Sequence, residues 1–352
     1  MNNTRSTVLR ELSRERLAEL LQNMKGRRAV LLGDMCLDVY WFADMTRSTL
    51  SRETPHFPLP VVSERTSAGA GGNAAVNLSF LCDNVTPVGV IGQDWRGICL
   101  SDALNARGLD TSFLVRSDKV ITNAYCKPMR RGYLGFDVED PRLDFENYQP
   151  LPDELEDRLL EKLDRACEGA DLLCVSDQFE YGCISGRVRE RINELAMGGL
   201  LTVVDSRSRI GLYRGCFLKP NEIECARAVS RFDVDISMDV NDDSSVERVA
   251  RLLTEKTCGN ACVTLGDKGC LIIKDGVATR IGAIKVVPPI DTVGAGDCFL
   301  SAFSLALSAG ATAAEAGTIG TLASAVTVKK INTTGSASPS EIFEVFDREA
   351  NV

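Results

Sequence analysis

The sequence predicts an α/β fold in which a doubly wound, mostly parallel sheet carries a small β-sheet lid. Two observations support this prediction. Short apolar runs typical of buried strands alternate with helix-compatible segments from residue 151 onward, which is the rhythm of a parallel sheet with helices on both faces. Two further segments, about 39–66 and 111–147, are extended in character and lack helical periodicity. We expect them to form the lid, because they flank a βα unit of the core.

Composition sets the broad class of the protein. The chain has 352 residues, of which 44% are hydrophobic and 25% charged, so it can form one large domain with an appendage. The net charge of −9 disfavours a nucleic-acid binder, and no apolar run reaches membrane-spanning length. The 13 cysteines are scattered without a secretory leader, which favours reduced, buried thiols in a cytoplasmic protein. A lone histidine, His56, excludes His-rich metal sites.

Residues 1–27 are predicted to form an N-terminal helical extension that precedes a single large domain over 28–352. This segment is charged and carries a leucine stripe at positions 9, 12, 17, 20 and 21, which favours a surface helix used for packing or oligomer contact. The domain then opens with the buried strand Ala29–Asp34, and Asp38 follows shortly. Side chains just beyond such a strand face the ligand crevice of a parallel sheet. Asp34 and Asp38 are therefore candidates to bind a polyol, and a role as turn-making residues is equally compatible.

The segment 68–77 is rich in glycine, alanine and asparagine and opens a helix. Gly71 and Gly72 would permit close ligand approach. Asn73 and Asn77, one helical turn apart, could bond to sugar hydroxyls. Tight packing of the helix on the sheet is the alternative, and it explains the alanines better than the asparagines.

After the strand 85–91 and its helix, the lid segment 111–147 brings several cations together. Lys127, Arg130 and Arg142 could hold a phosphate on a substrate through charge-assisted contacts. A solvated, charged lid face is the alternative interpretation. Beyond residue 150 the expected helices and strands alternate regularly: helix 153–168, strand 171–175, helix 186–197, strand 200–205, strands 216–218 and 261–265, and helices 312–328 and 339–348.

The stretch Ile290–Phe299 carries the strongest chemical signal. Gly294 and Gly296 allow a tight turn whose N–H groups can approach an anion, and the apolar segment that follows predicts a buried helix. Asp297 would lie at the start of this helix, where an ionised carboxylate could take the proton of a hydroxyl attacking phosphorus. The alternative is a simple helix cap.

Five sequence motifs, which occur along the chain in the same order as in one known family, resemble the motifs of that family. Gly71-Gly72-Asn73 and Asp291-Thr292-Val293-Gly294-Ala295-Gly296-Asp297 resemble the two signatures of the ribokinase-like (PfkB) carbohydrate kinases. Three intermediate landmarks fall in family order: Gly92-x-Asp94-x-x-Gly97, Asn221-x-x-Glu224 and Thr264-x-Gly266-x-x-Gly269. The resemblance spans roughly residues 28–348.

The resemblance implies ATP and Mg²⁺ as cofactors, a sugar or sugar phosphate as acceptor, and a role for each matching residue. Asp297 would be the catalytic base, and Gly294, Ala295 and Gly296 the anion hole for the transferred phosphoryl group. Asn221 and Glu224 would organise Mg²⁺, largely through water, while Thr264, Gly266 and Gly269 would line the nucleotide. The sugar would contact Asp34, Asp38, Gly72, Asn73 and Asn77. The loop also permits a monovalent cation such as K⁺ near Asp291 and Val293, and the lid permits a homodimer.

Within the family, the chain is most similar to the bacterial heptose 7-phosphate kinases. The residues that carry this are Gly33-Asp34-x-x-Leu37-Asp38-x-Tyr40-Trp41, Pro60-Val61-Val62 and Arg142-Leu143-Asp144-Phe145-Glu146. The polar triplet Asp205-Ser206-Arg207 also matches in place. The subgroup's Arg-Ile-Ser-Pro-Glu-Ala-Pro run reads differently here, as Thr49-Leu50-Ser51-Arg52-Glu53-Thr54-Pro55.

Four alternatives bear on function. A nucleoside kinase of the same fold is compatible with the aromatic residues Tyr40, Trp41 and Phe57. A non-catalytic sugar-binding protein is disfavoured because the candidate base and the Asn-x-x-Glu pair are both present. A Rossmann dehydrogenase and a Walker-type kinase are disfavoured because their glycine motifs are missing.

Overall fold

A computed structural model describes residues 12–350 apart from 134, 233–237, 240 and 332–333. Its largest element is a nine-stranded sheet in the order β14-β13-β12-β11-β10-β9-β1-β4-β5. The strands from β12 through β5 run parallel, and β13 and β14 complete one edge in antiparallel pairing. The strands are β1 (Arg28–Gly33), β4 (Asn84–Gly92), β5 (Leu114–Ser117), β9 (Leu172–Asp177), β10 (Thr202–Ser206), β11 (Phe217–Leu218), β12 (Asn260–Thr264), β13 (Cys270–Lys274) and β14 (Val277–Ile281).

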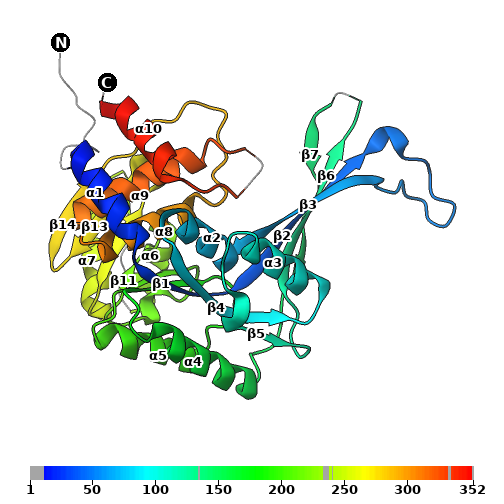
Figure 1. The fold of residues 1–352 in the computed structure, drawn as a ribbon. Helices are drawn as coiled ribbons and strands as arrows, with labels where there is room; N and C mark the ends of the chain where they lie inside the picture. Colours follow the sequence, from blue (N-terminus) through cyan, green and yellow to red (C-terminus); the bar gives the residue numbers. More distant parts are fainter. Residues whose placement is uncertain (1–11, 134, 233–237, 240, 332–333, 351–352) are drawn as a thin grey trace, which may run out of the picture.

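Helices cover both faces of this sheet, as predicted for a doubly wound fold (Figure 1). Successive residues of β1 point to opposite sides: Leu31 joins one core cluster and Leu32 the other. The first cluster packs beneath α1 (Arg14–Lys25), α2 (Gly71–Leu81), α3 (Trp95–Asn105), α8 (Ala295–Ser308), α9 (Ala313–Thr327) and α10 (Pro339–Ala350). The second packs beneath α4 (Asp153–Cys167), α5 (Gly186–Met197), α6 (Glu222–Ser230) and α7 (Asp243–Thr257).

A second, five-stranded sheet projects from the main body (Figure 1). Its strands are β2 (Met35–Asp44), β3 (Val61–Ala70), β6 (Asn123–Arg131), β7 (Asp137–Glu139) and β8 (Leu143–Phe145). It differs from the predicted bounds in two ways. Its first segment, predicted as about 39–66, runs from residue 35 to residue 70. Strand β5, predicted to belong to the lid, pairs with β4 in the main sheet. The reason is burial: Leu114 and Val115 lie in the two core clusters.

Helix α1 is packed more deeply than a surface helix would be. Ser13 caps its start by accepting a hydrogen bond from the N–H of Arg16, and its leucines join the first core cluster. The Arg16 side chain also forms an ion pair with Glu315 at the start of α9, with Nε 2.8 Å from the carboxylate. Of the predicted stripe, Leu9 lies outside the described residues.

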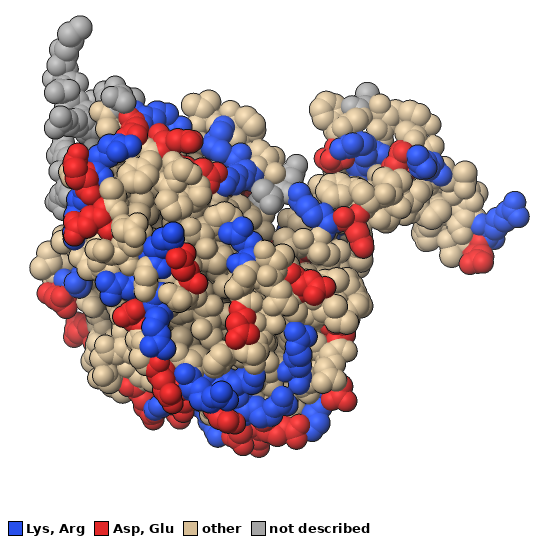
Figure 2. Space-filling model, viewed as in Figure 1, with Lys and Arg blue, Asp and Glu red and all other residues tan. Residues whose placement is uncertain are grey.

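Three surface and composition findings complete the fold. No helix in the described part of the chain combines the length and apolar character needed to cross a membrane. All 13 cysteines are free, and most are buried, as expected for reduced thiols. Acidic and basic side chains alternate over the face shown in Figure 2 without a continuous basic stripe.

Candidate active site

Asp297 lies in the first turn of α8, directly behind the predicted glycine turn. Gly294 adopts a left-handed conformation with φ of 78°, and a side chain there would approach the amide nitrogen of Asn73 at 3.2 Å. At Gly296 no atom lies within 4 Å of where a Cβ would be. A side chain at Gly296 would thus meet open space in the first turn of α8, at a helix N-terminus where an anion is favoured, while the Ala295 N–H donates to the Thr292 carbonyl at 3.2 Å.

Two asparagines of α2 hold the Asp297 carboxylate. Asn73 Nδ2 donates to Asp297 Oδ2 at 2.7 Å, and Asn77 Nδ2 donates to Asn73 Oδ1 at 3.1 Å and to its carbonyl oxygen at 2.9 Å. Both asparagines are about 2% exposed. Sugar contacts are predicted for both residues. Each Nδ2 group bonds within the protein, whereas the buried Asn77 Oδ1 has no hydrogen-bond partner among the described residues. Asn73 orients the candidate base directly, and Asn77 does so through Asn73. The sequence alone does not reveal this role, because Asn73 and Asp297 are 224 positions apart.

Gly72 lies where α2 packs against neighbouring elements. A Cβ at this position would lie 3.1 Å from the Cβ of Ala68 and 3.2 Å from Leu100 Cδ1. The glycine thus allows α2 to pack closely against β3 and α3, which is the alternative that the sequence left open.

The surroundings of Asp297 raise its pKa. Burial raises it most, and the negative charges of Asp205 and Asp38 add to this, while the Asn73 hydrogen bond and Lys219 oppose it; the resulting pKa is about 7. Lys219, at the end of β11, lies 3.1 Å from Asp205, at the end of β10, and both side chains are nearly buried. Burial lowers the pKa of Lys219, but its carboxylate neighbours outweigh this and raise it overall. Sequence reasoning missed Lys219, although its position after a short strand was a signal.

This pKa predicts the pH dependence of activity. Because Asp297 must be ionised to accept a proton, kcat/KM should fall on the acidic side with an apparent pKa of about 7. Asn73→Ala removes a hydrogen bond that favours the ionised form, so its acidic limb should lie at higher pH. The matched control is Asn84→Ala, because Asn84 is an exposed asparagine at the start of β4. An acidic limb that is unchanged in Asn73→Ala would contradict this placement.

Asp38 lies on β2, where it pairs with Tyr125 of β6. It is 4% exposed, and a Cβ on Gly69 would lie 3.1 Å from its carboxyl carbon, so the carboxylate packs tightly against the glycine backbone. Lys127 Nζ is 3.0 Å from the Tyr40 hydroxyl and 3.8 Å from Asp38 Oδ1. Burial raises the pKa of Asp38, and Lys127 and Arg142 oppose that rise. Lys127 therefore balances a buried carboxylate, and its contact with a substrate phosphate stays a prediction.

Asp34 also has a different role from the one predicted. Its Oδ2 accepts hydrogen bonds from the N–H groups of Gln178 and Phe179, each at 2.8 Å, and its Oδ1 accepts one from Cys183 at 2.7 Å. A buried carboxylate that receives three backbone donors is a structural clamp. Asp34 thus holds the loop after β9, which fits the structural alternative that the sequence left open; a sugar contact stays a prediction.

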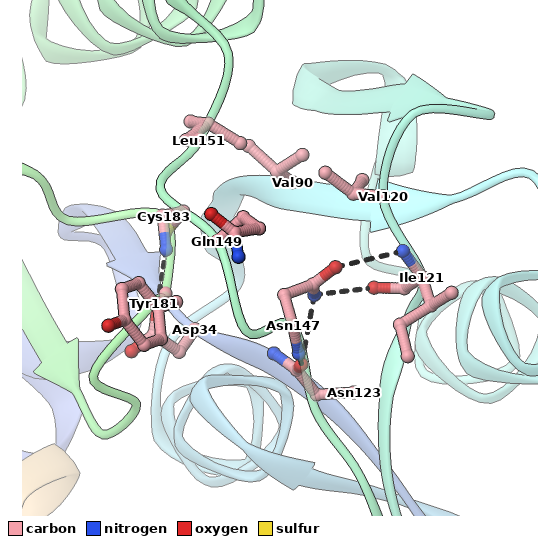
Figure 3. A pocket seen from close by; sticks show the side chains of 11 residues that line it. Asp34, Val90, Val120, Ile121, Asn123, Asn147, Gln149, Leu151, Tyr181 and Cys183 are labelled. Atoms are coloured by element: carbon pink, nitrogen blue, oxygen red, sulfur yellow. Dashed lines mark hydrogen bonds between the residues drawn. The ribbon is translucent and has the colours of Figure 1, made fainter.

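A small cavity lies beside this clamp (Figure 3). Its volume of about 20 Å³ has room for roughly one water molecule. Asn147 closes one side by bonding to the backbone of Ile121 and to Asn123. The cavity is too small for a sugar, and Asp297 does not line it.

The outer lid arginines are paired with acids. Arg130 lies 2.8 Å from Asp140. Arg142 donates to both oxygens of Asp144, at 2.6 and 2.7 Å, and its guanidinium lies 3.9 Å from the centre of the Tyr125 ring. Of Arg130 and Arg142, only Arg142 lies close enough to Asp38 to affect its pKa.

Asn221 and Glu224 form a capping box at the start of α6. The Asn221 N–H donates to Glu224 Oε2, and the Glu224 N–H donates to Asn221 Oδ1, both at 2.8 Å. Burial and the charge of Asp205 raise the pKa of Glu224, while Lys219 and Arg207 oppose the rise. The carboxylates of Glu224 and Asp205 repel each other, and such a pair suits a hard divalent cation. No three His, Cys, Asp or Glu side chains gather into a metal cluster among the described residues, and Mg²⁺ commonly binds through one or two carboxylates, water and phosphates.

The remaining predicted residues lie on two loops. After β12, Gly266 has a φ of 57° with open space around it, whereas a Cβ on Gly269 would collide with the carbonyl oxygen of Ile281. Thr264 Oγ1 donates to the Pro220 carbonyl at 3.4 Å, which joins this loop to the α6 cap. Before α8, the Val293 N–H donates to Asp291 Oδ1 at 3.0 Å. Gly269 thus has a packing role, and Gly266 remains open to a ligand.

Comparisons with known proteins agree with this architecture. Residues 30–196 and 212–341 match the profile of the pfkB family carbohydrate kinases. The Bifunctional protein HldE of Bradyrhizobium diazoefficiens is 31% identical, and the match covers 89% of this chain and 62% of the relative. For HldE of Gluconobacter oxydans the values are 29%, 89% and 63%. The chain thus spans less than two thirds of these curated relatives.

Solved structures share the fold. Phosphofructokinase-2 from Escherichia coli, in complex with substrates and products, superposes with a TM-score of 0.70 at 18% identity, covering 92% of this chain and 99% of that one. Ribokinase from Arabidopsis thaliana, complexed with ribose and ATP, gives 0.66 at 16% identity, covering 91% and 98%. These likenesses confirm the predicted α/β fold with its large, mostly parallel sheet and smaller second sheet.

Proposed function

Since the chain belongs to the pfkB family of carbohydrate kinases and is thus a phosphotransferase with a hydroxyl acceptor, we propose that it transfers the γ-phosphate of ATP to a sugar phosphate. The acceptor proposed is a heptose phosphate or a close analogue. The observation that carries the proposal is the Asp297 carboxylate, held by Asn73 beside an open glycine turn at a helix N-terminus.

The site residues divide the work of the reaction. Asn73 occupies Oδ2 of Asp297, which leaves Oδ1 to accept the proton of the acceptor hydroxyl. The hydroxyl oxygen then forms the new bond to the γ-phosphorus, the bond to the bridging oxygen breaks, and ADP leaves. The N–H groups at Gly294, Ala295 and Gly296 would stabilise the charge on the phosphoryl oxygens. Asp38, which lies in the second sheet near enough to raise the pKa of Asp297, would orient the sugar.

Nucleotide and cations would lie on the other side of Asp297. Asn221 and Glu224 would hold Mg²⁺, mainly through water, and the ion would supply charge neutralisation for the phosphates. The open backbone at Gly266, with Thr264 and Gly269 shaping its loop, would border the nucleotide. Asp291 and Val293 are proposed to border a monovalent cation, and phosphofructokinase-2 from Escherichia coli, which shares the fold, has been solved in complex with potassium. The second sheet is proposed as a lid that excludes water and as a surface for a homodimer.

Support for a phosphorylated acceptor comes from two sources. The lid motifs resemble those of heptose 7-phosphate kinases, and relatives named HldE match most of the chain. A nucleoside kinase from Methanocaldococcus jannaschii shares the fold at a TM-score of 0.61 and 18% identity, so nucleosides are the competing acceptor class.

An acceptor panel tests the proposal. ADP release from Mg-ATP would be measured with heptose 7-phosphate, hexose phosphates, the unphosphorylated parent sugars and nucleosides. We expect kcat/KM to be largest for a sugar phosphate. A nucleoside as the best acceptor, or ATP binding without turnover of any acceptor, would contradict the proposal.

A further inference from the structure

Two arginines from different parts of the chain converge on Tyr125. Tyr125 lies on β6 directly opposite Asp38, so its side chain borders the acceptor side of the candidate site. Arg142, beyond β7, stacks over the Tyr125 ring at 3.9 Å. Arg207 comes from the main sheet, one residue after β10, where its N–H donates to the carbonyl of Asp177 at 3.1 Å. Asp177 is two residues before Phe179, whose ring lies 5.8 Å from that of Tyr125, so Arg207 lies on the same side of the site. Burial raises the pKa of the Tyr125 hydroxyl, and Arg207 opposes that rise.

These two guanidinium groups keep donors available. Arg142 uses Nε and one terminal nitrogen on Asp144, so its other N–H groups can bind a further acceptor. Arg207 is exposed and forms no ion pair within the described part of the chain. Arg209, two residues further on, contrasts with it, because the buried Asp177 carboxylate and two backbone carbonyls engage it. An exposed arginine without an acid partner at a site mouth suits an anion.

The position of this cluster indicates which anion it would bind. Phe179 lies 5.8 Å from Tyr125, between ring centres, and closes a third side. Tyr125 lies opposite Asp38, and the charge of Arg142 opposes the raised pKa of Asp38, so the cluster lies next to the residue proposed to orient the sugar. The charge of Arg207 also opposes the raised pKa of Glu224, which places Arg207 near the residue proposed to hold Mg²⁺. Arg207 could therefore contact the transferred phosphoryl group in place of the acceptor phosphate. The experiment must distinguish these two roles.

We propose that Arg142 and Arg207 form an anion clamp across Tyr125 that binds the phosphate already present on the acceptor and thereby selects sugar phosphates over free sugars. The inference rests on the proposed function and adds a specificity determinant to it. Two guanidinium groups and a phenol would supply donors to three oxygens of a phosphomonoester.

The test compares Arg207→Gln and Arg142→Gln with wild type on two acceptors: the best sugar phosphate of the panel and its unphosphorylated parent. Loss of one charge-assisted hydrogen bond corresponds to roughly a 10- to 100-fold effect. We expect kcat/KM for the phosphorylated acceptor to fall by about that factor, through KM, and kcat/KM for the parent sugar to change less than about twofold. Arg207→Lys should keep part of the selectivity because it keeps the charge.

Arg131→Gln is the matched control, because Arg131 lies in the same sheet but binds Asp137 away from the site. An equal loss on both acceptors, above all through kcat, would show that Arg207 contacts the transferred phosphoryl group and would overturn the clamp. So would unchanged selectivity in the Arg207 and Arg142 variants. Wild-type turnover of the parent sugar as efficiently as of the sugar phosphate would refute the clamp but leave the kinase function intact, whereas no turnover of either would refute the function itself.

Discussion

Asp297→Asn should lose about 10² to 10⁴ of kcat while ATP affinity remains nearly unchanged, because the amide cannot accept the hydroxyl proton. Asn73 would still bond to the side-chain oxygen of the new residue, so the local geometry should persist. The measurement is kcat from ADP release together with the Kd for ATP by calorimetry. Wild-type turnover in this variant would show that the base lies elsewhere.

The same substitution should raise stability, which serves as its folding control. The folded protein raises the pKa of Asp297 from its ordinary value of 3.8 to about 7. The associated stability is therefore fully present below about pH 4 and is lost as pH rises through about 7. Above that pH, the Asp297→Asn variant should melt a few degrees higher than wild type. A lower melting temperature at pH 8 would mean that the carboxylate is stabilised in its charged form.

Lys219→Met should cost about 3–5 kcal/mol of folding free energy, because it leaves the nearly buried carboxylate of Asp205 without a partner. It should also move the acidic limb of the pH–rate profile to higher pH, since Lys219 helps to keep Asp297 ionised. Urea unfolding and kcat/KM against pH measure the two effects.

The double variant Lys219→Met with Asp205→Asn distinguishes charge from shape. It should recover most of the stability, because no unpaired buried charge remains. Lys256→Met, an exposed lysine in the last turn of α7, should change neither quantity. A double variant no more stable than the single variant would argue that Lys219 acts through packing.

The sequence predicted those parts of the site that are formed by residues close together in the chain. The turn at Gly294 and the helix that begins at Ala295 are visible within a short stretch of sequence, because a left-handed glycine and an apolar run are short-range features. The β13–β14 hairpin was missed although its Asp275-Gly276 turn, with both residues at positive φ, is a typical hairpin signal.

Partnerships between distant residues could not be predicted in the same way. Asn73 reaches Asp297 across 224 positions, and the sequence cannot show that its amide faces a carboxylate and not a ligand. The sequence predicts that Asp34 binds a sugar. In the fold, three backbone N–H groups of the loop after β9 donate hydrogen bonds to the Asp34 carboxylate. Polar residues at strand ends are thus identified by sequence, but their partners are set by how the strands pack.

The most direct test follows the γ-phosphate of labelled Mg-ATP in the presence of a sugar phosphate, for wild type and for Asp297→Asn. The account predicts that wild type places the label on the sugar in a one-to-one ratio with ADP and that the variant binds ATP but transfers almost none. Label released as inorganic phosphate by wild type, or equal transfer by both proteins, would contradict it.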